Sequence, residues 1–168
     1  MGITLRDGTA VEVRPIRSDD KALLARGWAL LSPETQRRRF LTAKPRLTSS
    51  DLRYLTEVDG HGHVALVAVL ADRPGHVAGV GRFVRLADDP DTAEFAIVVG
   101  DALQGQGLGG HLADLLAARA VEVSVKRFTA TVLSENEAVQ RLIARISNHL
   151  AYDHRTGGVR EVVADLAA

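Results

Sequence analysis

A glutamate and a glycine-rich segment lie close together in the middle of this chain. Glu94 belongs to the apolar run at residues 92–99, and Gln104-Gly105-Gln106-Gly107-Leu108-Gly109-Gly110 follows soon after it. A glycine turn that opens a helix presents successive backbone N–H groups and the positive end of the helix dipole to an anion. Glycine also lets a phosphate approach the main chain closely. The stretch therefore predicts a phosphate-binding turn beside a carboxylate that could serve as a base.

Other interpretations of the glycines are weaker. The spacing Gly105-x-Gly107-x-x-Gly110 also fits the dinucleotide fingerprint, which normally opens a long doubly wound domain with an acidic residue about 20 positions later. Glu135 lies beyond that window, and too little chain follows. His111 stands where a nucleotide-binding P-loop needs lysine. A purely structural glycine turn remains the alternative to a phosphate site.

Composition limits the classes of protein. With 168 residues and 46% hydrophobic content, the chain can bury one core, and we expect a single domain at residues 1–168. The 21 basic and 21 acidic residues give no net field toward nucleic acid or an anionic membrane. No run approaches the roughly 20 apolar residues of a membrane span, and the first residues do not resemble a signal peptide. We therefore expect a cytoplasmic protein with neither nucleic acid nor a membrane as partner.

The chain contains no cysteine. Disulfides, thiolate metal sites and a cysteinyl acyl intermediate are therefore excluded. His61 and His63 have a metal-like spacing, but no third ligand is evident, so we expect a solvated loop there and no metal. We likewise expect the charged run at residues 36–39 to lie on a solvated helix face, although it could contact a coenzyme phosphate or an acidic protein.

Periodicity and turn signals predict the elements that position Glu94 and the glycines. Asp7-Gly8 indicates a hairpin, and apolar residues at helical spacing begin at Leu23. Ser32-Pro33 and Thr48 with Asp51 are typical helix starts. We expect one helix that ends before residue 33 and further helices at 33–40, 52–58, 107–123 and 135–146. We expect one strand that ends near residue 16 and further strands at 64–69, 77–84, 92–99, 128–133, 150–154 and 159–164. A turn is expected at residues 73–75.

Glu94 is the candidate catalytic residue. Its neighbours read as buried on both faces of the strand, so desolvation should raise the pKa of the carboxyl toward neutrality. An amine such as lysine, with an ordinary pKa of about 10.4, must lose a proton before it can act as a nucleophile. Glu94 could remove that proton directly or through water. The alternative is a surface carboxylate at the start of an edge strand.

The glycine spacing and the order of elements resemble the GCN5-related N-acetyltransferases, the GNAT superfamily. The similarity is greatest to the Pat-type bacterial protein lysine acetyltransferases, whose GNAT domain is often fused to another domain. The matching segments, in order, are Arg14-Pro15-Ile16-Arg17, Leu31-Ser32-Pro33-Glu34-Thr35, Arg39-Phe40, Val58-Asp59, Ala65-Leu66-Val67-Ala68 and Ala93-Glu94. The resemblance implies an α/β (α+β) fold: a mixed central sheet with an antiparallel N-terminal meander, one parallel βαβ unit with splayed strands, and a C-terminal hairpin.

The resemblance also implies roles for individual residues. Acetyl-CoA would be the cosubstrate, with Glu94 as catalytic base and a bulge in its strand opening the sheet. Asn136 would bind the coenzyme, although an asparagine there is also a natural helix cap. The residues expected to bind the coenzyme are Ile97, Val98, Val99, Gln104, Gly105, Gln106, Gly107, Leu108, Gly109, Gly110 and Asn136. One N–H group of residues 97–99 would polarise the thioester carbonyl.

Two positions depart from the family pattern. Ile143 stands where many members have a tyrosine that acts as general acid, and Ser147-Asn148 replaces the usual Gly-Phe. A thiol leaves readily because its ordinary pKa is near 8.5, so a dedicated acid is not required. Tyr152 is a weak candidate substitute.

Together these observations favour an enzyme that transfers acetyl from acetyl-CoA directly to an amine. The resemblance points to the ε-amino group of a protein lysine, with an acyl-CoA synthetase as a probable class of substrate. One alternative is an N-acetyltransferase for a small amine, such as a polyamine, an amino acid or an antibiotic. The other is a non-catalytic acyl-CoA sensor, which the departures at Ile143 and Ser147-Asn148 favour and the retained Glu94 opposes.

Overall fold

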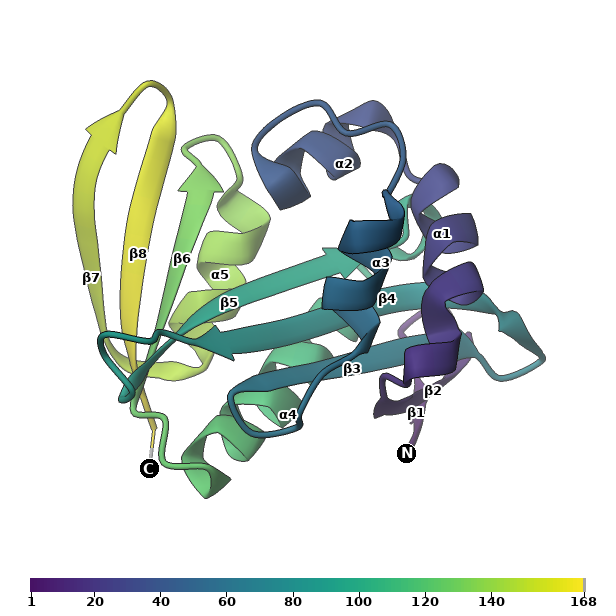
Figure 1. Cartoon of the computed structure of the whole chain (residues 1–168), viewed down its shortest axis with the longest axis horizontal. Coiled ribbons are helices and arrows are strands. Elements are labelled where there is room, and N and C mark those ends of the chain that lie inside the picture. The colour runs from purple at the N-terminus through teal and green to yellow at the C-terminus, as the bar shows by residue number, and fades with distance from the viewer. Residues whose placement is uncertain (168) are drawn as a thin grey trace.

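The computed structural model describes residues 1–167, apart from the side chains of residues 152–156. Helices α1 to α3 come early, and α4 and α5 flank β6 (Figure 1). The helices are α1 (Lys21–Ala29), α2 (Pro33–Phe40), α3 (Ser49–Thr56), α4 (Leu108–Glu122) and α5 (Glu137–Arg145), with short 3-10 turns η1 (Ser18–Asp20) and η2 (Asp101–Leu103). The strands are β1 (Gly2–Thr4), β2 (Ala10–Pro15), β3 (His63–Leu70), β4 (Arg73–Arg85), β5 (Thr92–Val99), β6 (Arg127–Leu133), β7 (Ser147–Thr156) and β8 (Val159–Leu166).

All the strands join one mixed sheet in the order β1-β2-β3-β4-β5-β6-β8-β7. The pairs from β1 to β5 are antiparallel, β5 and β6 are parallel, and β8 returns between β6 and β7. The parallel pair is connected through α4, because parallel neighbours need a crossover. The expected meander, βαβ unit and C-terminal hairpin are therefore confirmed.

Strands β5 and β6 separate soon after they begin. Their pairing is confined to residues 92–94 of β5 with residues 127–129 of β6. Meanwhile β4 stays paired with β5 up to Val99, and β8 stays paired with β6 up to Leu133. Figure 1 shows the two strands diverging from this short contact. The register between β4 and β5 has no shift, so the sheet opens without the expected bulge in that pairing.

The two faces of the sheet are covered differently. Helices α1 and α3 pack on one face through Leu23, Leu24 and Leu55, and α4 lies across the other (Figure 1). A Cβ atom at Gly81 in β4 would lie 2.8 Å from Leu116 Cδ1, so glycine lets α4 approach the sheet closely. This close contact fixes the first turn of α4 near the open edge of β5.

Helix starts agree with the sequence, whereas one turn does not. The Ser32 side chain accepts a hydrogen bond from Thr35 N at the start of α2, and Thr48 forms a capping box with Asp51 before α3. The turn expected at residues 73–75 is wrong, because these residues begin β4. The register between β3 and β4 shifts where Pro74 lies, which suits a residue that cannot donate a ladder hydrogen bond.

No helix in the described part of the chain is long and apolar enough to cross a membrane.

Candidate active site

The opening between β5 and β6 forms a cavity of about 780 Å³. It is lined by β5, the glycine turn, the first turn of α4, the end of β6, α5 and part of α2. Of the residues expected to bind the coenzyme, this cavity brings together Ile97, Val98, Val99, Gln104, Gly105, Gln106, Gly107, Gly109, Gly110 and Asn136. Leu108 does not belong to this group: its side chain is fully buried in the core beneath the turn.

The glycine turn has the geometry of an anion site. Gly105 and Gly107 have φ angles of +76° and +97°, in the left-handed region that favours glycine. Gly107 is the N-cap of α4, where no side chain among the described residues caps the helix and no acidic residue occupies the first turn. The first N–H groups of α4 therefore remain available to an anion in the cavity.

The other two glycines differ in how closely they are packed. A Cβ atom at Gly109 would lie 3.1 Å from Leu142 Cδ1 on α5, closer than an ordinary contact. A Cβ atom at Gly110 would be 3.7 Å from Arg145 Nε, which is an ordinary contact. Arg145 donates two hydrogen bonds to the Asp114 carboxylate, of 2.9 and 2.7 Å, and this interaction raises the pKa of its guanidinium. Arg6 and Arg141 also line the cavity, so its rim is cationic although the chain is neutral overall.

Within the described part of the chain, the edge of β5 from residue 95 to 99 has no partner strand on the β6 side. Alternate backbone N–H and C=O groups of a strand point toward each neighbour, so some of these groups face the cavity. The Gln104 side chain donates to Val99 O over 3.2 Å and thereby ties the glycine turn to the strand end. A ligand could add to this edge as a further strand would.

Asn136 combines both roles considered for it. It is the N-cap of α5, where its Oδ1 accepts a long hydrogen bond of 3.5 Å from Val139 N, and it also lines the cavity. Ile143 is 1% exposed and belongs to the core, so it offers the cavity no acid group. The side chain of Tyr152 lies outside the described residues.

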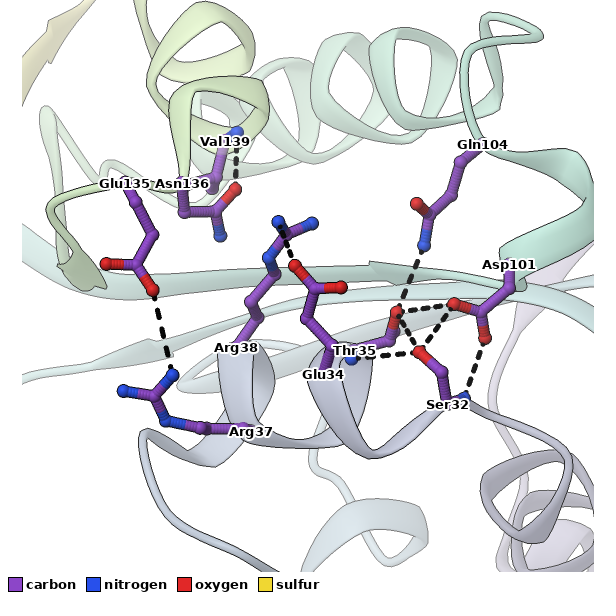
Figure 2. Close-up of polar contacts among 10 residues, drawn as sticks. All are labelled: Ser32, Glu34, Thr35, Arg37, Arg38, Asp101, Gln104, Glu135, Asn136 and Val139. Atoms are coloured by element: carbon purple, nitrogen blue, oxygen red, sulfur yellow. Dashed lines mark hydrogen bonds and ion pairs between the residues drawn. The ribbon is translucent and has the colours of Figure 1, made fainter.

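Helix α2 bridges the two sides of the opening, which the sequence did not reveal. At one end, Asp101 in η2 accepts hydrogen bonds from Ser32 N (2.9 Å), Ser32 Oγ (2.8 Å) and Thr35 Oγ1 (2.7 Å). On the other side of the opening, Arg37 Nη1 lies 3.6 Å from Oε1 of Glu135 in the turn before α5. Figure 2 shows these contacts on opposite sides of α2, with Gln104 donating to Thr35 as well.

The Asp101 carboxylate is held in its charged form. Partial burial raises the pKa of Asp101, but the hydrogen bonds from Thr35 and Ser32 outweigh that effect, and the pKa lies below its ordinary value. The anchor of α2 is therefore intact at neutral pH.

The expectation that Glu94 is buried is wrong: its side chain is exposed. It lies on β5 where the pairing with β6 ends, opposite Val84 of β4. Since side chains alternate along a strand, Glu94 shares a face of the sheet with Ala96 and Val98. It makes no ion pair within the described residues, and its charge favours the charged form of the nearby Arg39. Glu94 is thus a free carboxylate on the α3 side of the sheet.

The charged run at residues 36–39 is only partly the solvated face that was expected: Arg37 is exposed, whereas the other three residues are buried or half-buried. Gln36 is 7% exposed, and its Nε2 donates to Trp28 O over 2.9 Å. Arg39 is half-buried and lines the cavity between β5 and β6. Helix α2 lies against β5, so its inner face turns toward the site.

His63 is also not in a solvated loop, because it is the first residue of β3. Burial, reinforced by Arg82, lowers the pKa of His63 to about 4, so the ring is neutral at neutral pH. The contact of 2.9 Å with Arg82 Nη1 assigns His63 Nε2 as acceptor. No group of three His, Asp or Glu side chains that could hold a metal ion occurs among the described residues.

A second cavity of about 620 Å³ lies on the α1–α3 side of the sheet. Arg39, Val98 and Leu103 line both cavities. The strand end therefore separates a site with phosphate-binding features from a second space that could receive another molecule.

Comparison with known proteins identifies the class that this fold and site define. Residues 11–147 match the acetyltransferase (GNAT) domain family. The chain is 35% identical to acetyltransferase Pat from Mycolicibacterium smegmatis over 144 residues, which is 86% of this chain and 43% of that protein. The chain belongs to the GNAT acetyltransferase family, and it spans less than half the length of this curated relative.

Solved structures agree with this assignment. The GNAT domain of PAT from S. lividans superposes with a TM-score of 0.87 at 30% identity, covering 99% of this chain and 96% of that one. A GNAT superfamily phosphinothricin acetyltransferase from Sinorhizobium meliloti, in complex with acetyl-CoA, gives a TM-score of 0.74 at 13% identity, covering 98% and 89%. The second likeness concerns the fold alone.

Proposed function

We propose that this domain transfers an acetyl group from acetyl-CoA directly to an amine, and that the amine is the ε-amino group of a lysine in a protein. The observation that carries the proposal is that one cavity contains both the uncapped first turn of α4 and the unpaired edge of β5. The first turn of α4 suits a pyrophosphate, and the edge of β5 suits the amide-containing pantetheine arm of a coenzyme. The S. meliloti relative is described in complex with acetyl-CoA, which supports the choice of ligand.

In this proposal the chain binds the coenzyme mainly with its backbone. The first N–H groups of α4 hold the pyrophosphate, and Arg141 and Arg145 add positive charge at the rim. Residues 97–99 pair with the pantetheine arm, so the thioester lies beside β5. A backbone N–H group of this segment then stabilises the negative charge that develops on the carbonyl oxygen.

Glu94 removes the proton from the acceptor amine. Its exposure, with no ion pair in the described structure, leaves the carboxylate accessible to an amine or to a bridging water. Ile143 is apolar and buried, so this position supplies no acid. The thiol leaves without one, because its ordinary pKa near 8.5 makes the thiolate a good leaving group.

The similarity to acetyltransferase Pat and the motifs shared with protein lysine acetyltransferases support a protein acceptor. An acyl-CoA synthetase is the substrate class to test first. A folded partner would orient its lysine over a broad surface, so a short peptide or free lysine should react poorly.

The test compares kcat/KM for an intact acyl-CoA synthetase, its target peptide, spermidine and free amino acids, all with acetyl-CoA. We expect the intact protein to be the best substrate. If spermidine or an amino acid is better than every protein by a wide margin, the acceptor is a small amine. If nothing is acetylated although acetyl-CoA binds, the domain is an acyl-CoA sensor.

The small-amine acceptor has one observation in its favour, which is the size of the second cavity. Among the described residues that cavity is lined by four arginines and one carboxylate, Asp101, so it does not suit a polyamine.

A further inference from the structure

Four arginines line the second cavity, on the opposite side of the β5 end from the proposed coenzyme site. Arg26 and Arg73 are exposed, whereas the other two are half-buried or buried. Arg39 comes from α2 and Arg82 from β4. The remaining wall is largely apolar, with Leu24, Trp28, Phe40, Leu55 and Val80 among its members. Charged side chains in such surroundings are costly unless an opposite charge pairs with them.

Neither guanidinium group has a carboxylate partner within the described residues. Arg82 is 4% exposed, and its Nη1 donates to Leu55 O at 3.1 Å and contacts His63 Nε2 at 2.9 Å. These contacts leave its Nε and Nη2 without a partner in the described structure. Arg39 lies over the Phe40 ring, 4.6 Å from its centroid, and makes no hydrogen bond to a described residue. The guanidinium groups of Arg39 and Arg82 therefore have N–H groups at the cavity wall that donate to no described residue.

The charges around the pair do not balance. Burial lowers the pKa of Arg39, and the charge of Glu94 only partly opposes this effect. Burial, together with the like charge of Arg39, lowers the pKa of Arg82 to about 9, so Arg82 is still cationic at neutral pH. His63 is neutral and adds no negative charge. Asp101 also lines the cavity, and its carboxylate keeps its negative charge while it accepts hydrogen bonds from Ser32 and Thr35. The described lining contains Arg26 and Arg73 as well as Arg39 and Arg82, so positive charge still exceeds the single negative charge of Asp101, and an anion would neutralise the excess.

We propose that Arg39 and Arg82 form a carboxylate-binding subsite beside the thioester position. This inference rests on the proposed function in one respect, namely that the coenzyme occupies the cavity between β5 and β6. A carboxylate matches the planar fork of a guanidinium and accepts two hydrogen bonds from it. The apolar wall would receive the hydrocarbon part of the same molecule.

The carboxylate could come from either substrate, because Arg39 lines both cavities. It could be the far end of a dicarboxylic acyl group carried by CoA. It could instead be an acidic side chain next to the lysine of the acceptor. The chemistry at the arginines is the same in both cases, and the two sources are separable by experiment.

Binding measured by calorimetry tests the subsite without requiring any transfer. The first pair of ligands is succinyl-CoA and butyryl-CoA, which have four-carbon acyl chains with and without a terminal carboxylate. The second pair is N-acetyl-Lys-Glu-amide and N-acetyl-Lys-Gln-amide, added to protein saturated with CoA. The proteins are wild type, Arg39→Gln and the control Arg53→Gln, which removes an exposed charge on α3 that lines neither cavity. Arg39 is chosen because Arg82 also holds the Leu55 carbonyl of α3.

We expect the carboxylate member of one pair to bind wild type about 10- to 100-fold more tightly than its partner, as for a charge-assisted hydrogen bond in a shielded site. The preference should disappear in Arg39→Gln and persist in Arg53→Gln. The pair that shows it identifies the source. Equal binding within both pairs, or an unchanged preference in Arg39→Gln, overturns the subsite. Failure to acetylate any amine would contradict the proposed function but would leave this binding preference in place.

Discussion

Replacing Asp101 with alanine should release one end of α2. The carboxylate accepts three hydrogen bonds from Ser32 and Thr35, which are close to it only in the folded protein. An isolated helix as short as α2 is not stable in water, so its position depends on such anchors. Because Arg38 and Arg39 line the coenzyme cavity, release of α2 should also weaken acetyl-CoA binding.

The magnitude follows from the hydrogen bonds. A hydrogen bond to a charged group contributes about 1.5–3 kcal/mol when shielded from water. Asp101 is only slightly buried and its three bonds share one carboxylate, so we expect a total loss of about 2 kcal/mol. This loss would raise the population of states with α2 detached by roughly 30-fold.

Hydrogen exchange of the α2 amides and urea unfolding measure the effect. Asp91→Ala serves as control, because it removes the exposed pair with Lys126 far along the chain from α2 and should cost less than about 1 kcal/mol. A double-mutant cycle with Thr35→Val should give a coupling of about 1 kcal/mol. Unchanged exchange of α2 in Asp101→Ala, or strictly additive effects in the cycle, would refute the anchoring role.

Two further predictions concern the glycine turn and the response to acid. Gly110→Leu should raise the Kd for acetyl-CoA at least about tenfold, because the new side chain extends into the cavity. Its free energy of unfolding should change by no more than about 1 kcal/mol, because φ at Gly110 is not left-handed. Gly107→Ala should instead lower the free energy of unfolding by about 1–2 kcal/mol, because φ at Gly107 is +97°. Calorimetry with urea unfolding checks both, and equal affinity in Gly110→Leu would count against the coenzyme site. The hydrogen bond from Arg14 lowers the pKa of the buried Asp20 carboxyl below its ordinary 3.8. The ionised Asp20 therefore contributes fully to the free energy of unfolding above pH 3.8, and this contribution is lost as the pH falls through the lowered pKa of the folded state. Unfolding followed from about pH 6 to pH 2 should therefore show a smaller acid-side loss in Asp20→Asn than in wild type, and parallel curves would contradict the assignment.

The sequence predicted the elements well where local chemistry decides them. Ser32 and Thr48 cap helices as their residue types suggest, and the change from strand to helical periodicity located β5 and α4. The glycine turn was recognisable because its residues are contiguous in the chain.

The parts that depend on distant contacts were not predictable in the same way. Asp101 anchors residues that lie 66 to 69 positions earlier, a pairing that no local pattern encodes. The run at residues 36–39 looks solvated by composition, yet packing against β5 turns Arg39 inward. Glu94 was expected to be buried, but its side chain is exposed at the last position where β5 pairs with β6.

The pH dependence of acetyl transfer by wild type and Glu94→Gln tests the central claim most directly. With acetyl-CoA and an intact protein substrate at neutral pH, we expect Glu94→Gln to lower kcat by about 10² to 10⁴ while the Kd for acetyl-CoA is nearly unchanged. The deficit should shrink as the pH approaches the ordinary lysine pKa of about 10.4, where the amine loses its proton unaided. A rate equal to wild type at neutral pH, or a deficit that persists undiminished at high pH, would contradict the role of Glu94 as the base that activates the acceptor amine.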